Sequence, residues 1–204
     1  MRNTLFFLIL FLSINIFSQK KPPRIIFGEV IFGAAVEMRG SGGFLFGGEF
    51  NYQYKKKLFS IRYLEHLKLE TDGFLFSPFT KIPIIKEKFN HKEIGLLYGK
   101  RWVSKKSSLS VSGGVSLNTY TNRTLNNNNQ QVKLKNQYIG FPFELNIKCF
   151  NSIKKKYRIY GIVPVGKPTS FGRSFGFKLV GNISKNSFFG IGFIYGLGIH
   201  KKYK

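Results

Sequence analysis

The sequence predicts an all-β protein, an antiparallel up-and-down transmembrane β-barrel of eight strands that follows a cleaved N-terminal signal peptide. Three observations predict it: the layout of the amino terminus, the composition, and the alternation of apolar with small or polar side chains. The 204 residues suffice for one domain, and the 23 Phe, 10 Tyr and 22 Gly favour strands over helices. The predicted organisation is a signal peptide at 1–18, a short segment at 19–24 and a barrel at 25–204.

The composition excludes several classes of protein. Aromatic residues make up 17% of the chain, which rules out a disordered basic tail because their burial offsets chain entropy. One cysteine supports neither a disulfide framework nor a Cys-based zinc site. The net charge is +24, but the lysines cluster at turns without a basic helix or an aromatic RNA-binding motif. We therefore expect no nucleic-acid partner and favour contact of these lysines with anionic lipid head groups.

The amino terminus has the three regions of a secretory signal peptide. A short positive start at 1–3 precedes an apolar run at 5–12, and Ser18 offers a small residue before the polar segment 19–23. The run is shorter than the roughly 20 apolar residues that span a bilayer, and Ser13 and Asn15 interrupt it, so cleavage is favoured over anchoring. Removal of 1–18 leaves 32 basic and 9 acidic residues, a net charge of +23.

Apolar residues recur with a period of two through most of the remaining chain, which is typical of sheets with one polar and one apolar face. In 188–200, for example, Phe189, Ile191, Phe193, Tyr195 and Leu197 alternate mainly with glycines. The predicted strands are 25–38, 43–54, 58–70, 92–102, 108–119, 137–149, 172–183 and 188–200.

The bulky face is predicted to point outward. Eight strands enclose only enough room for side chains, so the large groups would overpack an interior that Gly, Ser and Asn can fill. The strand lengths match those of tilted membrane strands, and export agrees with an outer-membrane location. The predicted lipid-facing residues are Phe44, Phe46, Phe50, Tyr52, Phe141, Phe143, Phe193 and Tyr195.

The connections predict a topology as well. Basic turns at 55–57, 103–107 and 151–156 fall on one side, and longer loops at 71–91 and 121–136 fall on the other, as in barrels with short periplasmic turns and long outer loops. Residues 157–171 make one periplasmic connection unusually long. A ten-stranded barrel that adds 157–165 and 74–85 is the alternative, and Pro164 and Pro168 argue against it.

The inward faces concentrate charge. The residues predicted to face the lumen are Glu37, Glu49, Arg62, His66, Lys68, Glu70, Glu93, Arg101, Glu144, Lys148 and Lys178. They form either an ion path with a gate or a ladder of ion pairs that plugs a narrow barrel, and the small interior of eight strands favours the plug. The three histidines are scattered over His66, His91 and His200. We expect no catalytic residues, no metal site and no cofactor.

Three further segments stand out in the second half of the chain: Glu-Ile-Gly-Leu-Leu-Tyr-Gly at 93–99, Tyr-Ile-Gly-Phe-Pro-Phe-Glu at 138–144 and Phe-Lys-Leu-Val-Gly-Asn-Ile-Ser-Lys-Asn-Ser at 177–187. In these segments the chain resembles uncharacterised small outer-membrane β-barrel proteins of Gram-negative bacteria. The resemblance covers about half of the chain and implies a barrel of the general OmpA or OmpX shape. It also implies insertion by the outer-membrane assembly machinery, for which Gly190, Phe193 and Tyr195 resemble the recognised terminal strand.

Three functional hypotheses follow. The first is a non-enzymatic outer-membrane barrel with a plugged polar lumen and a structural role or a binding role in its loops. The second is a porin-like ten-stranded channel for small solutes. The third is a secreted soluble barrel with a lipophilic ligand. The expected partners are the outer-membrane lipids and, as the resemblance implies, the assembly machinery, and the sequence specifies no external ligand.

Overall fold

The structure is a computed structural model that describes residues 25–38, 42–77, 80–125, 131–151, 153, 155–159, 162–169 and 171–202. The predicted signal peptide at 1–18 and the segment 19–24 lie outside these residues. In the described part of the chain, no helix has the length and apolar character needed to cross a membrane.

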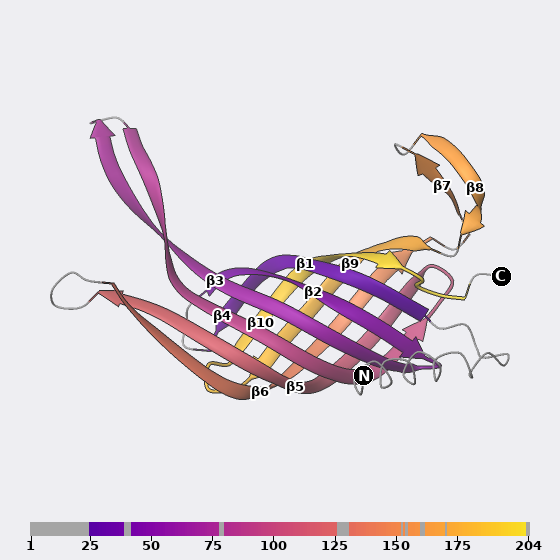
Figure 1. Cartoon of the computed structure of the whole chain (residues 1–204), viewed down its shortest axis with the longest axis horizontal. Helices are drawn as coiled ribbons and strands as arrows, with labels where there is room; N and C mark the ends of the chain where they lie inside the picture. Colours follow the sequence, from indigo (N-terminus) through magenta and orange to yellow (C-terminus); the bar gives the residue numbers. More distant parts are fainter. Residues whose placement is uncertain are drawn as a thin grey trace, which may run out of the picture.

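Eight antiparallel strands close into a barrel (Figure 1). They are β1 (Ile25–Glu37), β2 (Gly42–Tyr54), β3 (Lys57–Ser77), β4 (Thr80–Val103), β5 (Ser107–Leu125), β6 (Gln131–Phe150), β9 (Gly172–Ile183) and β10 (Phe188–Gly198). Neighbours along the barrel follow the order β1, β10, β9, β6, β5, β4, β3, β2. The first and last strands close the cylinder, in register from Phe27 opposite Gly198 to Glu37 opposite Phe188. Closure pairs the strand edges, which a sheet in lipid requires.

The eight-strand prediction is confirmed, and the ten-strand alternative is wrong. Most of 157–165 belongs to a separate two-stranded sheet of β7 (Lys155–Ile159) and β8 (Val163–Thr169), which is not part of the barrel. Residues 74–85 extend β3 and β4 instead of adding a strand. Pro164 lies in β8, which pairs on one side only, where a missing backbone donor is tolerated.

In the described residues the strands extend far into both predicted outer loops, which corrects the prediction for 71–77, 80–91, 121–125 and 131–136. Residues 78–79 and 126–130 lie outside the described residues. Strands β3 and β4 stay paired out to Ser77 opposite Thr80, and β5 and β6 stay paired out to Leu125 opposite Gln131. Figure 1 shows both hairpins projecting from the end of the barrel opposite to β7 and β8. Pro83 opposite Gly73 lies in the projecting hairpin, whose outer edges have no neighbouring strand to bond.

One proline lies within the barrel wall itself. Pro142 in β6 faces Asn182 of β9, and the register between β5 and β6 is interrupted between Gly113 opposite Phe143 and Ser116 opposite Gly140. Because proline has no backbone N–H, the pairing on that side of β6 lacks a donor at this point.

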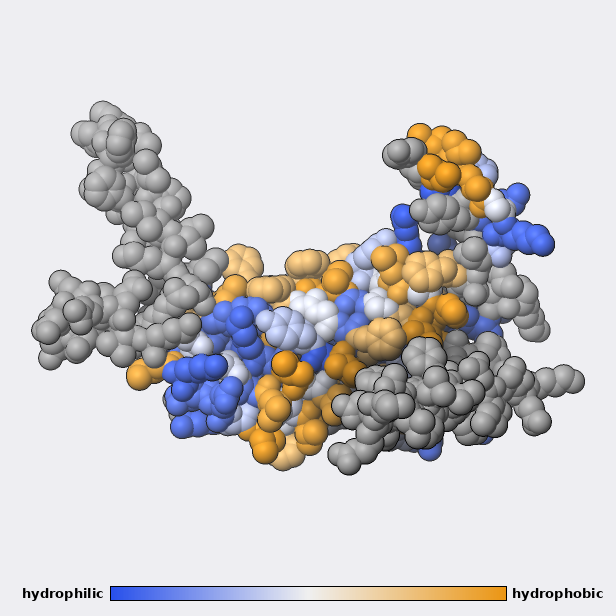
Figure 2. All heavy atoms as spheres, in the orientation of Figure 1, coloured by the Kyte–Doolittle hydropathy of each residue, from blue (hydrophilic) through white to orange (hydrophobic). Residues whose placement is uncertain are grey.

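The apolar side chains lie on the outside of the barrel. Figure 2 shows hydrophobic residues spread over the outer surface of the wall, with hydrophilic residues gathered toward its ends. On β10 the odd-numbered residues from Phe189 to Leu197 are exposed, and Ile194 between them is buried. The alternation therefore has the predicted direction, with the bulky apolar side chains on the outer face of the barrel.

Candidate functional site

The interior of the barrel is lined by charged side chains, and the structure places the predicted inward set as follows. Buried in the lumen are Glu37, Glu49, Arg62, His66, Glu93, Arg101, Glu144, Lys148 and Lys178. Lys68 is half-buried on the same face of β3, and the side chain of Glu70 lies outside the described residues. The buried residues come from six strands. Because side chains alternate between the two faces of a strand, residues two apart on each strand point into the same interior.

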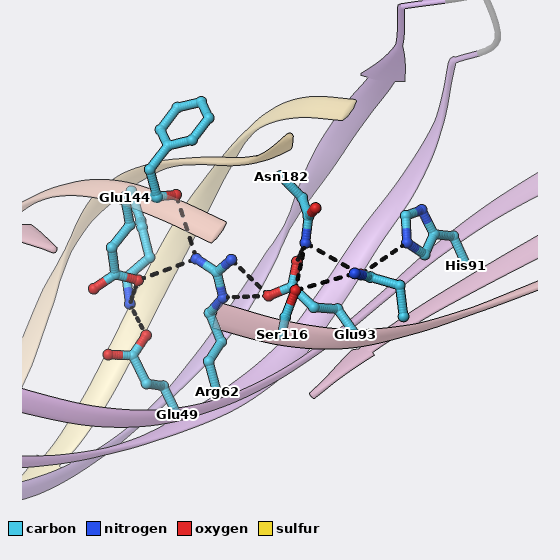
Figure 3. A network of polar contacts seen from close by, with 10 residues as sticks. Glu49, Arg62, His91, Glu93, Ser116, Glu144 and Asn182 are labelled. Atoms are coloured by element: carbon cyan, nitrogen blue, oxygen red, sulfur yellow. Dashed lines mark hydrogen bonds and ion pairs between the residues drawn. The ribbon is translucent and has the colours of Figure 1, made fainter. Parts of the chain in front are cut away.

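Arg62 of β3 is buried in the interior between two carboxylates, those of Glu93 and Glu144 (Figure 3). Its Nε and Nη2 donate to Glu93 Oε1 at 2.9 and 2.6 Å, and its Nη1 lies 3.3 Å from Glu144 Oε2. All three side chains are 1% exposed. The guanidinium therefore bridges β4 and β6 across the lumen, where removal of water makes the attraction stronger than at a surface.

A second cation, Lys178 of β9, links three carboxylates. Its Nζ pairs with Glu49, and it lies 3.3 Å from both Glu29 Oε2 and Glu144 Oε2. Glu29 also pairs with Lys148 and accepts a hydrogen bond from Asn146 Nδ2 at 3.2 Å. The ion pairs thus form one connected network from Lys148 through Lys178 and Glu144 to Arg62 and Glu93.

Amides continue this network toward the projecting hairpins. Asn182 Nδ2 donates to Glu93 Oε2 at 2.6 Å, to Ser116 Oγ at 2.8 Å and to Asn118 Oδ1 at 3.1 Å. Asn118 Oδ1 is in turn 3.1 Å from His91 Nε2. Figure 3 shows this chain running from Arg62 to His91. The carboxylate of Glu93 therefore has partners on both sides, as a buried charge requires.

A ring of side chains closes the lumen at the end with the short turns. Arg101 Nη1 donates to Gln53 Oε1 at 2.7 Å and to the His200 carbonyl at 3.0 Å. Its guanidinium carbon lies 4.7 Å from the centre of the Phe27 ring, and the Phe150 and His200 rings stack at 5.9 Å. These contacts combine hydrogen bonds with cation–π attraction, so the end is both filled and polar.

Aromatic and aliphatic groups fill the lumen near the projecting hairpins. The rings of His91 and Phe188 meet edge to face at 5.1 Å, and those of His66 and Phe89 do so at 5.2 Å. A buried apolar cluster adjoins them, formed by Ile31, Ala35, Leu45, Leu64, Val180, Phe188 and Ile194. The interior is therefore only partly polar, which the prediction of a lumen filled by small polar residues and charges did not include.

Three buried ionisable residues of the lumen are absent from the predicted inward set. They are Glu29, His91 and His200, each at most 5% exposed. Glu29 was recoverable because it lies an even number of residues from Glu37 on the same strand. His91 lies two residues before Glu93, and His200 lies an even number of residues after the buried Ile194, so the period of two is consistent with both being inside. They stand at the end of the predicted loop 71–91 and at the end of the last predicted strand, where the alternation is weak evidence on its own.

The predicted lipid-facing residues lie on the outer surface. Exposed there are Phe44, Phe50, Phe141, Phe143, Phe193 and Tyr195, and half-exposed are Phe46 and Tyr52. The outward face of β6 is apolar over 139–149, between Gln137 and Asn151. Ten residue steps span about 34 Å of strand, which a tilt of about 40° reduces to a band about 26 Å tall. That height matches the hydrocarbon layer of an outer membrane.

A polar row borders this band at the end with the projecting hairpins. Glu65, Lys92, Thr119 and Gln137 are in register across β3 to β6, all on the outward face. Lys92 Nζ lies 3.3 Å from Glu65 Oε1, and Tyr63 Oη donates to Glu65 Oε2 at 2.7 Å. The row defines where the apolar surface ends.

A cavity of about 10 Å³ lies beside the ionic network, which is about the space one water molecule needs. Its lining residues are Glu29, Val30, Ile31, Gly48, Glu49, Arg62, Leu64, Lys178 and Ile194. Within the described residues, no group of three or more His, Cys, Asp and Glu side chains is placed to hold a metal ion.

A closed antiparallel cylinder with an apolar outer band and a charged interior defines a class of protein, the small outer-membrane β-barrels, and the chain has that fold. It is similar to the crystal structure of Neisserial surface protein A, with a TM-score of 0.50 and 12% identity over 87% of this chain and 97% of that chain.

Two further solved structures are similar at lower scores. The N-terminal β-barrel domain of Pseudomonas aeruginosa OprF has a TM-score of 0.44 and 12% identity over 85% of this chain and 96% of that chain. Ail, the attachment invasion locus protein of Yersinia pestis, has a TM-score of 0.41 and 12% identity over 86% and 95%. No family model and no curated protein matches the sequence. At these identities the likeness concerns the fold alone.

Proposed function

We propose that the chain is a non-enzymatic integral outer-membrane protein whose lumen is plugged by its own ion-paired side chains. In this proposal residues 1–18 direct export, the assembly machinery inserts the barrel with β10 as the recognised strand, and outer-membrane lipids surround the apolar band. The role of the protein is then structural, or it consists of binding by the segments that project from the barrel.

The observation that carries this proposal is the connected ion-pair network across the lumen. Arg62, Lys148 and Lys178 each pair with buried carboxylates. Removing one partner of a buried pair costs about 3–5 kcal/mol, because the other charge is then left uncompensated. Each of these charges is therefore held by its partners across the lumen. In this proposal the ion pairs link strands on different sides of the wall, and their side chains block the passage of solutes through the lumen.

Conductance across a planar bilayer tests the plug. Refolded protein is expected to give no stable discrete current steps, and regular steps would contradict the plugged lumen and favour a narrow channel. Outer-membrane fractionation together with a shift of gel migration on boiling tests the membrane barrel itself. Recovery of the chain in the soluble fraction without detergent would overturn the location.

The projecting β3–β4 hairpin is the proposed binding segment, because loops and extensions on a rigid scaffold commonly carry binding. From Leu67 opposite Asn90 to Ser77 opposite Thr80 it extends about 30 Å beyond the packed interior. Replacement of 70–86 by an Asn-Gly turn between Leu69 and Glu87 is expected to leave the heat-modifiable barrel intact. Loss of the folded band in this variant would show that the hairpin is part of the scaffold.

A further inference from the structure

The β7–β8 hairpin has two chemically different faces. Residues directly opposite in an antiparallel pair share a face, and Ile159 stands opposite Val163 while Arg158 stands opposite Pro164. Val165, two residues beyond Val163, joins the apolar face, and Lys156, two residues before Arg158, joins the basic one. The hairpin is therefore amphipathic, although its two strands contribute nothing to the barrel wall.

None of the residues that the structure describes covers the apolar face of the hairpin. Ile159, Val163 and Val165 are 45, 57 and 42% exposed, and Ile162 at the turn is 77% exposed. Strands β7 and β8 contact each other and have no more than marginal contact with any barrel strand. A two-stranded hairpin alone is at best marginally stable in water, so this one requires a surface on which the apolar face can pack.

The position of the hairpin indicates which surface that is. Figure 1 shows β7 and β8 beside the barrel at the end with the short turns, displaced to one side and not across the opening. Figure 2 shows hydrophobic atoms on the hairpin next to hydrophilic ones. A membrane around the apolar band would have its surface at this place.

The charge at this end fits an anionic surface. The exposed cations there are Lys55, Lys56, Lys57, Lys100, Lys105, Lys106, Lys156, Arg158, Lys167, Arg173 and Lys202. Five acidic side chains, those of Glu29, Glu37, Glu49, Glu93 and Glu144, lie in the lumen, and Glu65 lies on the outer face near the opposite end. Glu70, Asp72 and Glu87 belong to the β3–β4 extension, which projects from that opposite end. Lys57 stands directly opposite Lys100 on the outward face, an arrangement that is unfavourable without a nearby anion.

We propose that the β7–β8 hairpin is a membrane-surface anchor. Its face of Ile159, Val163 and Val165 inserts into the interface of the leaflet at the short-turn end, and Lys156 and Arg158 on the other face contact anionic lipid phosphates. This inference rests on the proposed membrane location. Amphipathic segments with basic polar faces bind lipid in this way, with the apolar face at the boundary of head groups and acyl chains.

Tryptophan quenching by lipid bromine tests the anchor. In a Trp102→Phe background, Val163→Trp and Pro164→Trp place the only tryptophan on opposite faces of the same strand. The protein is reconstituted in vesicles of phosphatidylcholine and phosphatidylglycerol that carry bromine near the head group. Quenching of Val163→Trp is expected to exceed that of Pro164→Trp by about twofold or more, and to fall in pure phosphatidylcholine.

The alternatives give separate results. Equal quenching at both positions, with a heat-modifiable barrel, overturns the anchor and leaves the membrane barrel standing. A blue-shifted Val163→Trp emission without bromine quenching also overturns it, because a protein or a second copy then covers the face. If the Trp102→Phe parent fails to insert, the proposed function falls instead. Val165→Trp, on the same face, replaces Val163→Trp should that variant alone fail to fold.

Discussion

The substitution Arg62→Met tests whether the lumen network stabilises the barrel. Methionine keeps much of the volume and removes the charge from a side chain that is 1% exposed. Two contacts to Glu93 at 2.6 and 2.9 Å and one to Glu144 at 3.3 Å are lost. Breaking one partner out of a buried pair costs about 3–5 kcal/mol.

The residual contacts set the expected magnitude. Glu93 keeps its hydrogen bond from Asn182 at 2.6 Å, and Glu144 keeps Lys178 at 3.3 Å. We therefore expect a loss near the lower limit, about 3 kcal/mol, which changes the unfolding equilibrium by about a hundredfold. Addition of Glu93→Gln to Arg62→Met removes the unpaired charge and is expected to recover part of this loss.

Urea titration in lipid vesicles measures the effect. Trp102, which is 43% exposed on the outer face, moves from lipid to water on unfolding and reports the transition. Arg173→Met is the matched control, because Arg173 is exposed on the outer face, and its effect is expected to stay within about 0.5 kcal/mol. The reasoning is refuted if Arg62→Met unfolds at the same urea concentration as Arg173→Met.

The remaining predictions concern the wall and the hairpin. Phe193→Arg in the middle of the apolar band is expected to cost about 2–4 kcal/mol and Leu197→Arg near its edge at most about 1 kcal/mol, and equal losses in urea titration would contradict a lipid-facing band. Gly140→Ala places a Cβ 2.2 Å from Asn182 Oδ1 and is expected to lower the free energy of unfolding by about 1–3 kcal/mol. In Gly28→Ala the added Cβ has no neighbour nearer than 3.9 Å, so this variant is expected to be neutral, and the same urea titration compares the two. Replacement of 155–169 by a short turn is expected to leave heat-modifiable migration unchanged, and loss of the folded band would show that the barrel needs the hairpin.

The alternation of residue types accounts for most of what the sequence predicted. On β10, glycines between Phe189 and Leu197 predicted one bulky face, and the structure has that face outward. A period of two in the sequence shows which face of the sheet a side chain lies on, but it does not show which residue of another strand that side chain contacts. The pairing of Arg62 with Glu93 depends on the register of β3 against β4, and its contact with Glu144 depends on how the cylinder closes. Neither can be read from one strand.

Prolines account for the main error in the strand ends. Pro78 and Pro83 indicated a loop at 71–91, because proline lacks the backbone N–H that a strand inside a sheet donates to its neighbour. Outside the barrel wall the hairpin has free edges, so Pro83 fits within β4. The strand boundaries there depend on tertiary context alone.

The central claim is that bulky side chains of the wall face hydrocarbon while charged and small ones face the lumen. Spin labels at consecutive cysteine positions along 189–197, in a Cys149→Ser background, test it through collision with oxygen, which concentrates in lipid. The account predicts oxygen accessibility that oscillates with a period of two residues and peaks at Phe189, Ile191, Phe193, Tyr195 and Leu197. A flat profile, or peaks at the intervening residues, would contradict it.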